Sequence, residues 1–295
     1  MENIAIILLN YNNYYDTFEC IKSIYANQYT ALKIFLVDNC STDDSYLQLK
    51  QLQKIYDFEL LKSDKNGGFS YGNNLGIRQA LKEKFDYVLL LNNDTLVENL
   101  NFEKLLLPFK LDDKIMVTTA KILYNDNKEL IWYDGGKINK LFAKVTHINY
   151  RKKNNSINTS RYVDFASGCL MCIKSELFSI IGLLNEDYFL YEEDTDFCYK
   201  IKKAKKKIYY LSTTFIYHKV NSTTKKTNND NYQYYSVRNK FLFIKQNYFI
   251  LAKPIVYFCA IMLCLHNIIR KKNTMKTTKI AYNDFLNGKK GKRNE

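Results

Sequence analysis

The feature that constrains the fold most is a regular alternation of short apolar runs and helix-like segments over the first 100 residues. Segments with helical spacing lie between the apolar runs, and the first of them starts with Asp16 as a helix cap. Strands that alternate with helices form a parallel sheet with helices on its faces. We therefore predict an α/β fold with a Rossmann-like, mostly parallel sheet, its first strands at 4–9, 32–39, 58–63 and 86–91 and its first helices at 16–27, 43–56 and 71–83.

Polar residues follow each of these four apolar runs. They are "NYNN" from Asn10, "DNCSTDDS" from Asp38, "DKNGGFSYGNN" from Asp64 and "NNDT" from Asn92. One such segment is an ordinary turn, because Asn, Asp and Gly favour turns. Ligands of parallel sheets bind at the carboxyl ends of the strands. Four polar strand ends on one edge therefore predict one wall of a binding site.

The pattern changes after Asp113. We expect strands at 114–124 and 207–220, a strand or loop with a glycine pair at 129–138, a strand running into a helix at 161–182, and a helix at 191–204. This second part completes the sheet and forms the opposite wall of the site. We place one domain at 1–220, made of a nucleotide half at about 1–113 and an acceptor half at about 114–220, and a helical, basic region at 221–295.

The net charge of +14 limits the possible partners. A basic surface suits nucleic acid, anionic lipid or a polyphosphate substrate. The sequence has no recognition helix, zinc finger or arginine-rich arm, so we expect no nucleic acid. The 7 cysteines, an odd number among apolar runs, are typical of free thiols in a reducing compartment. Residues 4–9 are too short for a signal peptide, and we expect a cytoplasmic location.

The C-terminal region contains the apolar stretch 249–269, followed by Arg270, Lys271 and Lys272. Its uninterrupted apolar part, 255–265, is shorter than the roughly 20 residues that span a bilayer. We expect this stretch to lie in or shallowly below a membrane surface, with the cations on anionic head groups, which places the protein peripherally on the inner face of the cell membrane. A core helix packed on the domain is the open alternative.

Six motifs, in order, resemble those of an inverting family 2 glycosyltransferase of the GT-A fold, in its rhamnosyltransferase-like branch. They are "IILLNYNN", "LVDNCSTDDS", "NGGFSYGNNLGI", "YVLLLNNDTLV", "VDFASGCLMCIKSELF" with "YEEDTDFCYKI", and "IYHKVNST". The resemblance covers roughly residues 4–239. It implies a sugar-nucleotide donor and an acceptor hydroxyl that a base must deprotonate.

The resemblance also implies a nucleotide-binding set. In the family, the carboxylate at Asp38 accepts from the imide N–H of uracil or thymine, which predicts a UDP- or dTDP-sugar donor. An Asx turn at Asp38 is the alternative. The other expected nucleotide-binding residues are Asn10, Asn66, Gly68, Asn73 and Asn93.

"NND" occupies the family's D-x-D position, where a carboxylate holds Mg²⁺ or Mn²⁺ against the diphosphate. We expect Asp94 to be the metal ligand and His218 to complete the site, although a lone histidine can also be structural. Asn92 stands where the first aspartate would be. A neutral amide there weakens the cation site, or marks a degenerate transferase.

"YEEDTD" supplies the candidate base. Crowded carboxylates repel one another and raise the pKa of at least one of them, which a general base near neutrality needs. The resemblance assigns the base to Asp194 and a supporting role to Glu193, whereas acids at a helix start can also be merely stabilising. Trp132, Asp134 and Gly168 are expected in the donor or acceptor pocket, and Arg238 either counters the phosphates or lies on the surface.

The expected function is inverting transfer of a sugar, with rhamnose a candidate, to a glycan or lipid-linked acceptor in cell-surface polysaccharide synthesis. One alternative is a sugar-phosphate nucleotidylyltransferase, but such an enzyme needs a basic, glycine-rich N-terminal loop and "LNYNNYYDTF" has no cation. The other alternative is a non-catalytic basic module that binds membrane or polyanion. That alternative leaves "NND", "EED" and His218 unexplained.

Overall fold

The computed structural model describes residues 2–27, 29–154, 159–220 and 229–293. The first part of the chain forms β1 (Ile4–Asn10), α1 (Tyr14–Tyr25), β2 (Leu32–Asp38), α2 (Ser45–Leu52), β3 (Phe58–Lys62), α3 (Gly68–Lys82), β4 (Tyr87–Asn92), β5 (Thr95–Leu96), α4 (Phe102–Leu106) and α5 (Pro108–Leu111). The middle forms β6 (Ile115–Tyr124), β7 (Ile131–Tyr133), β8 (Gly136–Asn139), β9 (Lys144–His147), β10 (Arg161–Val163), β11 (Leu170–Lys174), α6 (Leu177–Ile181), α7 (Glu193–Lys203) and β12 (Lys207–His218). The last part forms α8 (Asn229–Asn247), α9 (Lys253–Ile269) and α10 (Met275–Leu286).

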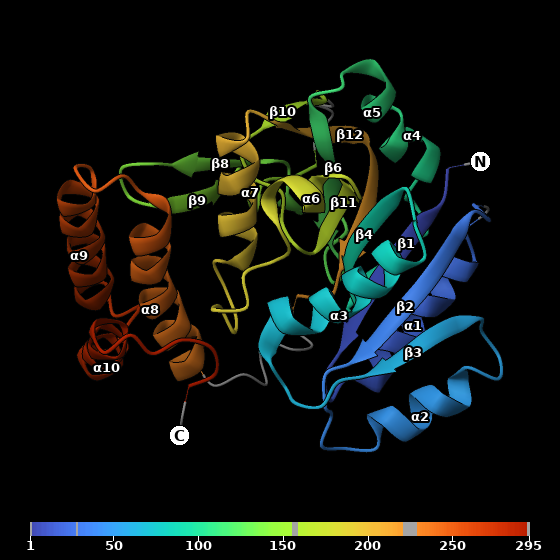
Figure 1. Cartoon of the computed structure of the whole chain (residues 1–295), viewed down its shortest axis with the longest axis horizontal. Coiled ribbons are helices and arrows are strands. Elements are labelled where there is room, and N and C mark those ends of the chain that lie inside the picture. The colour runs from blue at the N-terminus through green and yellow to red at the C-terminus, as the bar shows by residue number, and fades with distance from the viewer. Residues whose placement is uncertain (1, 28, 155–158, 221–228, 294–295) are drawn as a thin grey trace.

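The central sheet follows the order β10-β12-β6-β11-β4-β1-β2-β3, with β5 on β12 and β7 on β6 (Figure 1). The strands β3, β2, β1 and β4 are parallel neighbours, as the alternating pattern predicts. Right-handed crossovers then place α1 and α2 on one face and α3 on the other, because the strand order reverses after β3. The reversal makes a topological switch point between β1 and β4, where ligands of such sheets bind.

The second part adds antiparallel pairings to the central sheet: β10 with β12, β7 with β6, and β11 with both of its neighbours. β11 lies antiparallel between β4 and β6, while β12 lies parallel to β6. We expected a strand running into a helix at 161–182, and β11 followed by α6 agrees with this. The expectation missed that 161–163 forms a separate strand, β10, which pairs with β12 at the sheet edge, whereas β11 lies near the sheet centre. Between them, Ser167 and Gly168 turn the chain from one position to the other. Strand β9, which pairs with β8, was not predicted.

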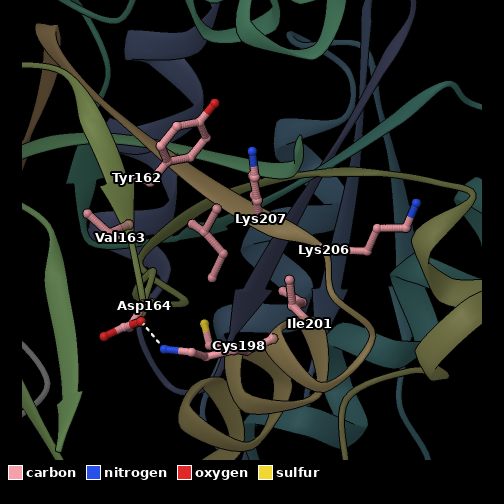
Figure 2. Close-up of a pocket in the computed structure, with 9 residues that line it drawn as sticks. Tyr162, Val163, Asp164, Cys198, Ile201, Lys206 and Lys207 are labelled. Carbon is pink, nitrogen blue, oxygen red and sulfur yellow. Dashed lines mark hydrogen bonds and ion pairs between the residues drawn. The ribbon is translucent and has the colours of Figure 1, made fainter. Parts of the chain in front are cut away.

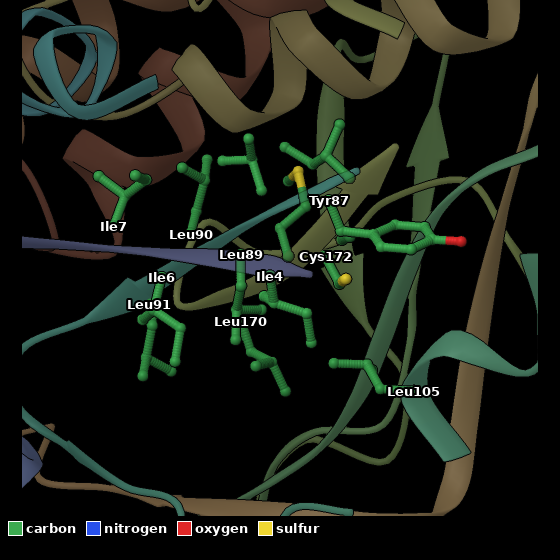
Figure 3. Packing of buried hydrophobic residues seen from close by; sticks show 14 of the residues in the cluster. Ile4, Ile6, Ile7, Tyr87, Leu89, Leu90, Leu91, Leu105, Leu170 and Cys172 are labelled. Carbon is green, nitrogen blue, oxygen red and sulfur yellow. The ribbon is translucent and has the colours of Figure 1, made fainter. Parts of the chain in front are cut away.

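The continuous apolar runs of β1 and β4 form the middle of the core. Ile6 and Leu89 are fully buried, and Leu170 of β11 and Leu105 of α4 belong to the same cluster (Figure 3). A strand covered on both faces has no solvent side, so its sequence does not alternate. The core therefore fixes the carboxyl ends of β1 and β4 side by side, with Leu9 paired to Asn92.

Helices α8–α10 form a second hydrophobic cluster beside the sheet (Figure 1). Tyr234, Phe241 and Phe243 of α8 are buried in it, together with Tyr188 and Phe189 of the loop before α7. Sequence periodicity does not predict α8, because a helix buried on most sides lacks the apolar stripe of a surface helix.

Helix α9 lies at the outer edge of this bundle (Figure 1). Val256, Ala260 and Cys264 form its buried stripe, and α9 contacts α8. This packing agrees with the core-helix alternative for one side of α9 only. In the described part of the chain, every helix is too short or too polar to cross a membrane.

Candidate active site

A cavity of about 1570 Å³ opens at the carboxyl ends of the parallel strands and extends to α8–α10. It brings together nine of the predicted site residues: Asn66, Gly68, Asn93, Asp94, Trp132, Gly168, Glu193, Asp194 and His218. A smaller pocket of about 330 Å³ lies between β10, α7 and β12. Figure 2 shows Tyr162, Asp164 and Lys207 at its wall, and it contains none of the predicted site residues.

Asp94 and His218 come together because β5 pairs with β12. In the antiparallel pairing, Thr95 lies opposite His218. The next residue on each side is also bonded, because the Lys219 N–H donates to the Asp94 carbonyl at 2.9 Å. As a result the His218 Nε2 atom lies 3.1 Å from the Asp94 Oδ1 atom, with both side chains buried. Burial lowers the pKa of the imidazole, but the Cys169 thiol and the Asp94 carboxylate more than offset this, and that pKa lies well above its ordinary value.

A carboxylate and an imidazole are donors that Mn²⁺ accepts. The described residues contain no group of three or more His, Cys, Asp or Glu side chains arranged to hold a metal ion. Two protein ligands still fit a hard cation that completes its shell with water and substrate oxygens. Asn92 also lines the cavity beside them, and an amide there can contact a cation-bound water.

Glu193 and Asp194 lie at the first turn of α7 and face the same cavity. Burial is the main cause that raises the pKa of Asp194 to about 6, and nearby Glu192 raises it further. The Gly168 N–H donates to Asp194 Oδ2 at 3.3 Å, and the Thr195 N–H to Oδ1 at 2.8 Å. Burial and the Asp194 charge raise the pKa of Glu193 well above its ordinary value. The arrangement supplies a carboxylate that can take a proton near neutral pH.

The loop that presents these acids has unusual backbone geometry, held by α8. Tyr191 and Glu192 have φ angles of 67° and 73°. The Asn239 side-chain amide donates to the carbonyls of Leu190 and Tyr191 at 2.7 and 2.9 Å, and Lys240 forms an ion pair with Glu192 at 3.0 Å. Sequence reasoning missed both α8 residues, since no motif marks them.

We expected Arg238 either to counter the phosphates or to lie on the surface, and the structure shows it in neither place. Its side chain is fully buried against the rings of Tyr234 and Tyr235, and its Nη2 atom donates to Asn239 Oδ1 at 2.8 Å. It does not line the cavity. Its contact orients the Asn239 amide toward the loop.

Gly68 joins the two walls of the cavity. Its φ is +86°, and a Cβ atom there would lie 2.0 Å from the Phe189 carbonyl oxygen. The neighbouring Phe69 N–H donates to that oxygen at 2.8 Å. Only glycine fits this approach, so the start of α3 is bonded directly to the loop before α7.

Three of the predicted nucleotide-binding residues are buried beneath the cavity surface. Asn10 donates to Asp38 Oδ1 at 2.9 Å, and the Ser41 N–H donates to Asp38 Oδ2 at 3.0 Å, which is the Asx turn of the alternative. Asn73 donates to the Phe69 carbonyl within α3.

Asn66 and Asn93 line the part of the cavity at the strand ends. Tyr11 and Asn39 line it with them; both belong to the polar strand ends "NYNN" and "DNCSTDDS" but were not among the individual residues predicted. Asn39 donates to Asn66 Oδ1 at 3.1 Å and to the Gly68 carbonyl, while its own buried Oδ1 has no hydrogen-bond partner among the described residues. Asn93 donates to Thr17 Oγ1 at 2.8 Å.

Of the three residues expected in the donor or acceptor pocket, Trp132 and Gly168 line the cavity and Asp134 does not. Trp132 packs edge-on against His218 at 4.7 Å and His147 at 5.0 Å between ring centroids, and all three line the cavity. Gly168 lies between the Phe69 ring and Asp194. Asp134 instead joins a buried network with Asn149, Arg161 and Tyr210, and it does not line the cavity. In this structure Asp134 anchors the chain between β7 and β8.

Comparison with known proteins decides the family. The model of the family "Glycosyl transferase family 2" matches residues 5–178, more than half of the chain. The chain belongs to glycosyl transferase family 2. The resemblance inferred from the motifs is thereby confirmed, and rhamnosyltransferases are among the relatives of this family 2 protein.

The family 2 protein is 28% identical over 209 residues to the low-salt glycan biosynthesis hexosyltransferase Agl10 of Haloferax volcanii, an alignment that covers 69% of this chain but 62% of that relative. It is 22% identical over 222 residues to the dTDP-rhamnosyl transferase RfbF of Shigella flexneri, covering 73% of this chain and 71% of that one. The mannosyltransferase PcManGT from Pyrobaculum calidifontis, solved in complex with GDP-Man and Mn²⁺, superposes with a TM-score of 0.60 at 14% identity, over 95% of this chain and 73% of that chain. These likenesses confirm the GT-A fold.

Proposed function

We propose that this family 2 protein is an inverting glycosyltransferase of cell-surface glycan synthesis. It moves a sugar from a UDP- or dTDP-sugar to a glycan or lipid-linked acceptor. The observation that carries the proposal is that Asp194, with its raised pKa, faces the same cavity as the Asp94–His218 pair. The family match leaves the nucleotidylyltransferase and the non-catalytic module without support.

The reaction needs a base on one side of the anomeric carbon and charge compensation on the other. A divalent cation bound by Asp94 and His218 would neutralise the departing diphosphate. Asp194 takes the proton of the acceptor hydroxyl, whose oxygen bonds to the anomeric carbon while the bond from that carbon to the phosphate oxygen breaks. Glu193 is buried beside it, and burial together with the Asp194 charge raises the pKa of Glu193, which favours a neutral Glu193 next to the charged base.

The donor assignment rests on the strand ends. Asp38 is held at the end of β2 by Asn10, and Asn39, which lines the cavity, has a buried Oδ1 atom without a hydrogen-bond partner among the described residues. An acceptor oxygen at this place suits the imide N–H of uracil or thymine. Rhamnose is the candidate sugar, because the relative RfbF is a dTDP-rhamnosyl transferase.

The enzyme acts peripherally at the inner face of the cell membrane. The outer side of α9 presents a continuous apolar stripe, with Phe258 63% and Ile269 79% exposed, and Arg270 follows it. An apolar helix face flanked by cations suits an anionic bilayer surface. All seven cysteines are free thiols, which suits a reducing compartment.

Vesicle co-sedimentation tests the membrane assignment. Phe258→Ser with Met262→Ser should weaken binding to phosphatidylglycerol vesicles, whereas Leu47→Ser with Ile55→Ser, on the exposed side of α2 and just beyond it, should not. Equal binding by both double variants would refute a role for α9.

The transfer reaction is tested by the hydrolysis of a panel of UDP-, dTDP- and GDP-sugars with Mn²⁺, Mg²⁺ or EDTA. We expect slow, cation-dependent hydrolysis of one UDP- or dTDP-sugar, lost in EDTA and in Asp94→Ala. Asp113→Ala, an exposed carboxylate outside the cavity, is the matched control. Hydrolysis of none of these donors, or equal rates in EDTA, would refute the proposal.

A further inference from the structure

The half of the cavity formed by α8–α10 and the C-terminal tail is lined by cations. They are Lys240, Lys271, Lys272, Lys292 and Arg293. Two of them are neutralised within the protein: Lys240 by Glu192 at 3.0 Å, and Arg293 by Asp230 at 3.1 Å. Lys271, Lys272 and Lys292 are exposed and form no ion pair with any carboxylate in the part of the chain that the structure describes.

The backbone fixes these three lysines at the cavity from two separate segments. Lys271 and Lys272 form the turn that ends α9, where their N–H groups donate to the carbonyls of Ile268 and Asn267, both at 2.9 Å. Lys292 belongs to the tail after α10, which returns to the loop before α7. The Gly291 N–H donates to the Asp187 carbonyl at 2.8 Å.

The tail is held on the other side of Lys292 as well. The Arg293 N–H donates to the Tyr235 hydroxyl at 2.8 Å, and the Arg293 guanidinium lies 4.5 Å from the centroid of the Tyr234 ring. Contacts on both sides of Lys292 therefore fix its backbone. The ammonium groups of Lys271, Lys272 and Lys292 therefore line one cavity without a carboxylate partner among the described residues, and an anion bound between them would offset their charge.

The wall beside these lysines is mixed in character. Leu263, Cys264 and Asn267 of α9 line the cavity, while Phe258 and Ile269 of the same helix belong to its exposed apolar stripe. The cationic cluster therefore lies at the end of the helix that we place on the membrane.

We propose that Lys271, Lys272 and Lys292 form a subsite for a phosphate or diphosphate group carried by the acceptor. This inference rests on the proposed function and specifies its acceptor as an anionic, phosphate-bearing molecule. Under the proposed function the donor diphosphate is a separate group, because the cation that would neutralise it would be held by the Asp94–His218 pair on the β-strand side. Flexible ammonium groups bind phosphate as point charges, without the fixed fork of arginine.

Binding of inorganic pyrophosphate in EDTA, measured by isothermal titration calorimetry, tests the subsite without the cation-dependent donor site. The test variant is Lys271→Gln/Lys272→Gln/Lys292→Gln. The matched control is Lys82→Gln/Lys104→Gln/Lys279→Gln, which removes the same charge from exposed positions that do not line the cavity. We expect about tenfold or more weaker binding in the test variant and little change in the control.

Wild-type affinity retained in the test variant, an equal loss in both variants, or no binding by the wild type would each overturn the subsite. If the triple variant does not fold, Lys272→Gln and Lys292→Gln singly must each weaken pyrophosphate binding. Two further probes, farnesyl diphosphate and phosphatidylglycerol vesicles, distinguish the source of the phosphate. If the lysines form the acceptor subsite, the test variant must lose binding to farnesyl diphosphate. If it loses only vesicle binding, the lysines bind lipid head groups instead. Donor hydrolysis by the wild type is measured separately, so pyrophosphate binding without any donor hydrolysis would refute the transferase and the acceptor role together while leaving an anion site.

Discussion

Replacing Asp194 with asparagine should stabilise the folded protein at neutral pH while nearly abolishing sugar transfer. Burial raises the pKa of this carboxyl from 3.8 to about 6. Each pKa unit corresponds to about 1.4 kcal/mol, so the charged form costs about 3 kcal/mol in the folded state. Because the pKa is raised in the folded state, protonation stabilises the protein. That stability is fully present below pH 3.8 and is lost as the pH rises through about 6.

Asparagine removes the charge but keeps only one oxygen. The carboxylate accepts from the N–H groups of Gly168 and Thr195, and one of these hydrogen bonds is lost, at a cost of about 1–2 kcal/mol. The net gain is about 1–2 kcal/mol at pH 7.5, which is a rise of a few degrees in Tm. The rate of transfer should fall about 10²- to 10⁴-fold, the usual contribution of a general base.

Differential scanning fluorimetry at pH 7.5 and pH 4, together with the release of nucleoside diphosphate, measures both effects. The gain in Tm should be present at pH 7.5 and absent at pH 4, where Asp194 is protonated. The wild-type rate should rise with pH through about 6 and reach about a tenth of its plateau at pH 5. Asp113→Asn is the exposed control. A variant that is less stable than the wild type at pH 7.5, or that keeps the wild-type rate, would show that Asp194 is not a buried base.

Three further predictions concern the cation site and the backbone around it. His218→Gln should lower the apparent affinity for Mn²⁺ at least tenfold in a metal titration of the reaction; an unchanged affinity would remove this residue from the site. Gly68→Ala should lower the free energy of unfolding by about 3 kcal/mol or more, because a Cβ clashes with the Phe189 carbonyl, whereas Gly182→Ala, at φ +79° with open space, should cost only about 1–2 kcal/mol. Urea denaturation compares the two, and equal losses would contradict the clash. Asn239→Ala should destabilise by about 2–3 kcal/mol and lower kcat, since two carbonyls of the loop before α7 lose their donor; a change in stability alone, with kcat intact, would argue that the clamp does not position the base.

The N-terminal half of the fold was predictable because its signals are local. Each apolar run is long enough for a buried strand, and each intervening helix has a periodic apolar face. Helix α8 gave no such signal, since it is buried on more than one side: Tyr234 and Phe241 lie on one face of it and Phe243 on the opposite face. The antiparallel insertion of β11 was also not predictable, because nothing in the run 170–174 distinguishes a parallel strand from an antiparallel one.

The candidate site shows the same division. Its acids and its histidine were found from motifs, and the structure brings Asp94, Asp194 and His218 to one cavity. The residues that hold the loop before Asp194, namely Asn239 and Lys240, lie on a helix without a motif. Their contacts to the loop before α7 depend on tertiary packing, which spacing in a sequence does not encode.

The pairing of β5 with β12 sets the order in which the molecule can be completed. β1 to β4 pair within the first part of the chain, and a growing chain can form them early. The Asp94–His218 pair requires a strand that ends at His218, and the clamp on the loop before α7 requires α8 after it. During synthesis, β1 to β4 can therefore pair before Asp94 meets His218 and before α8 holds the loop that presents Asp194.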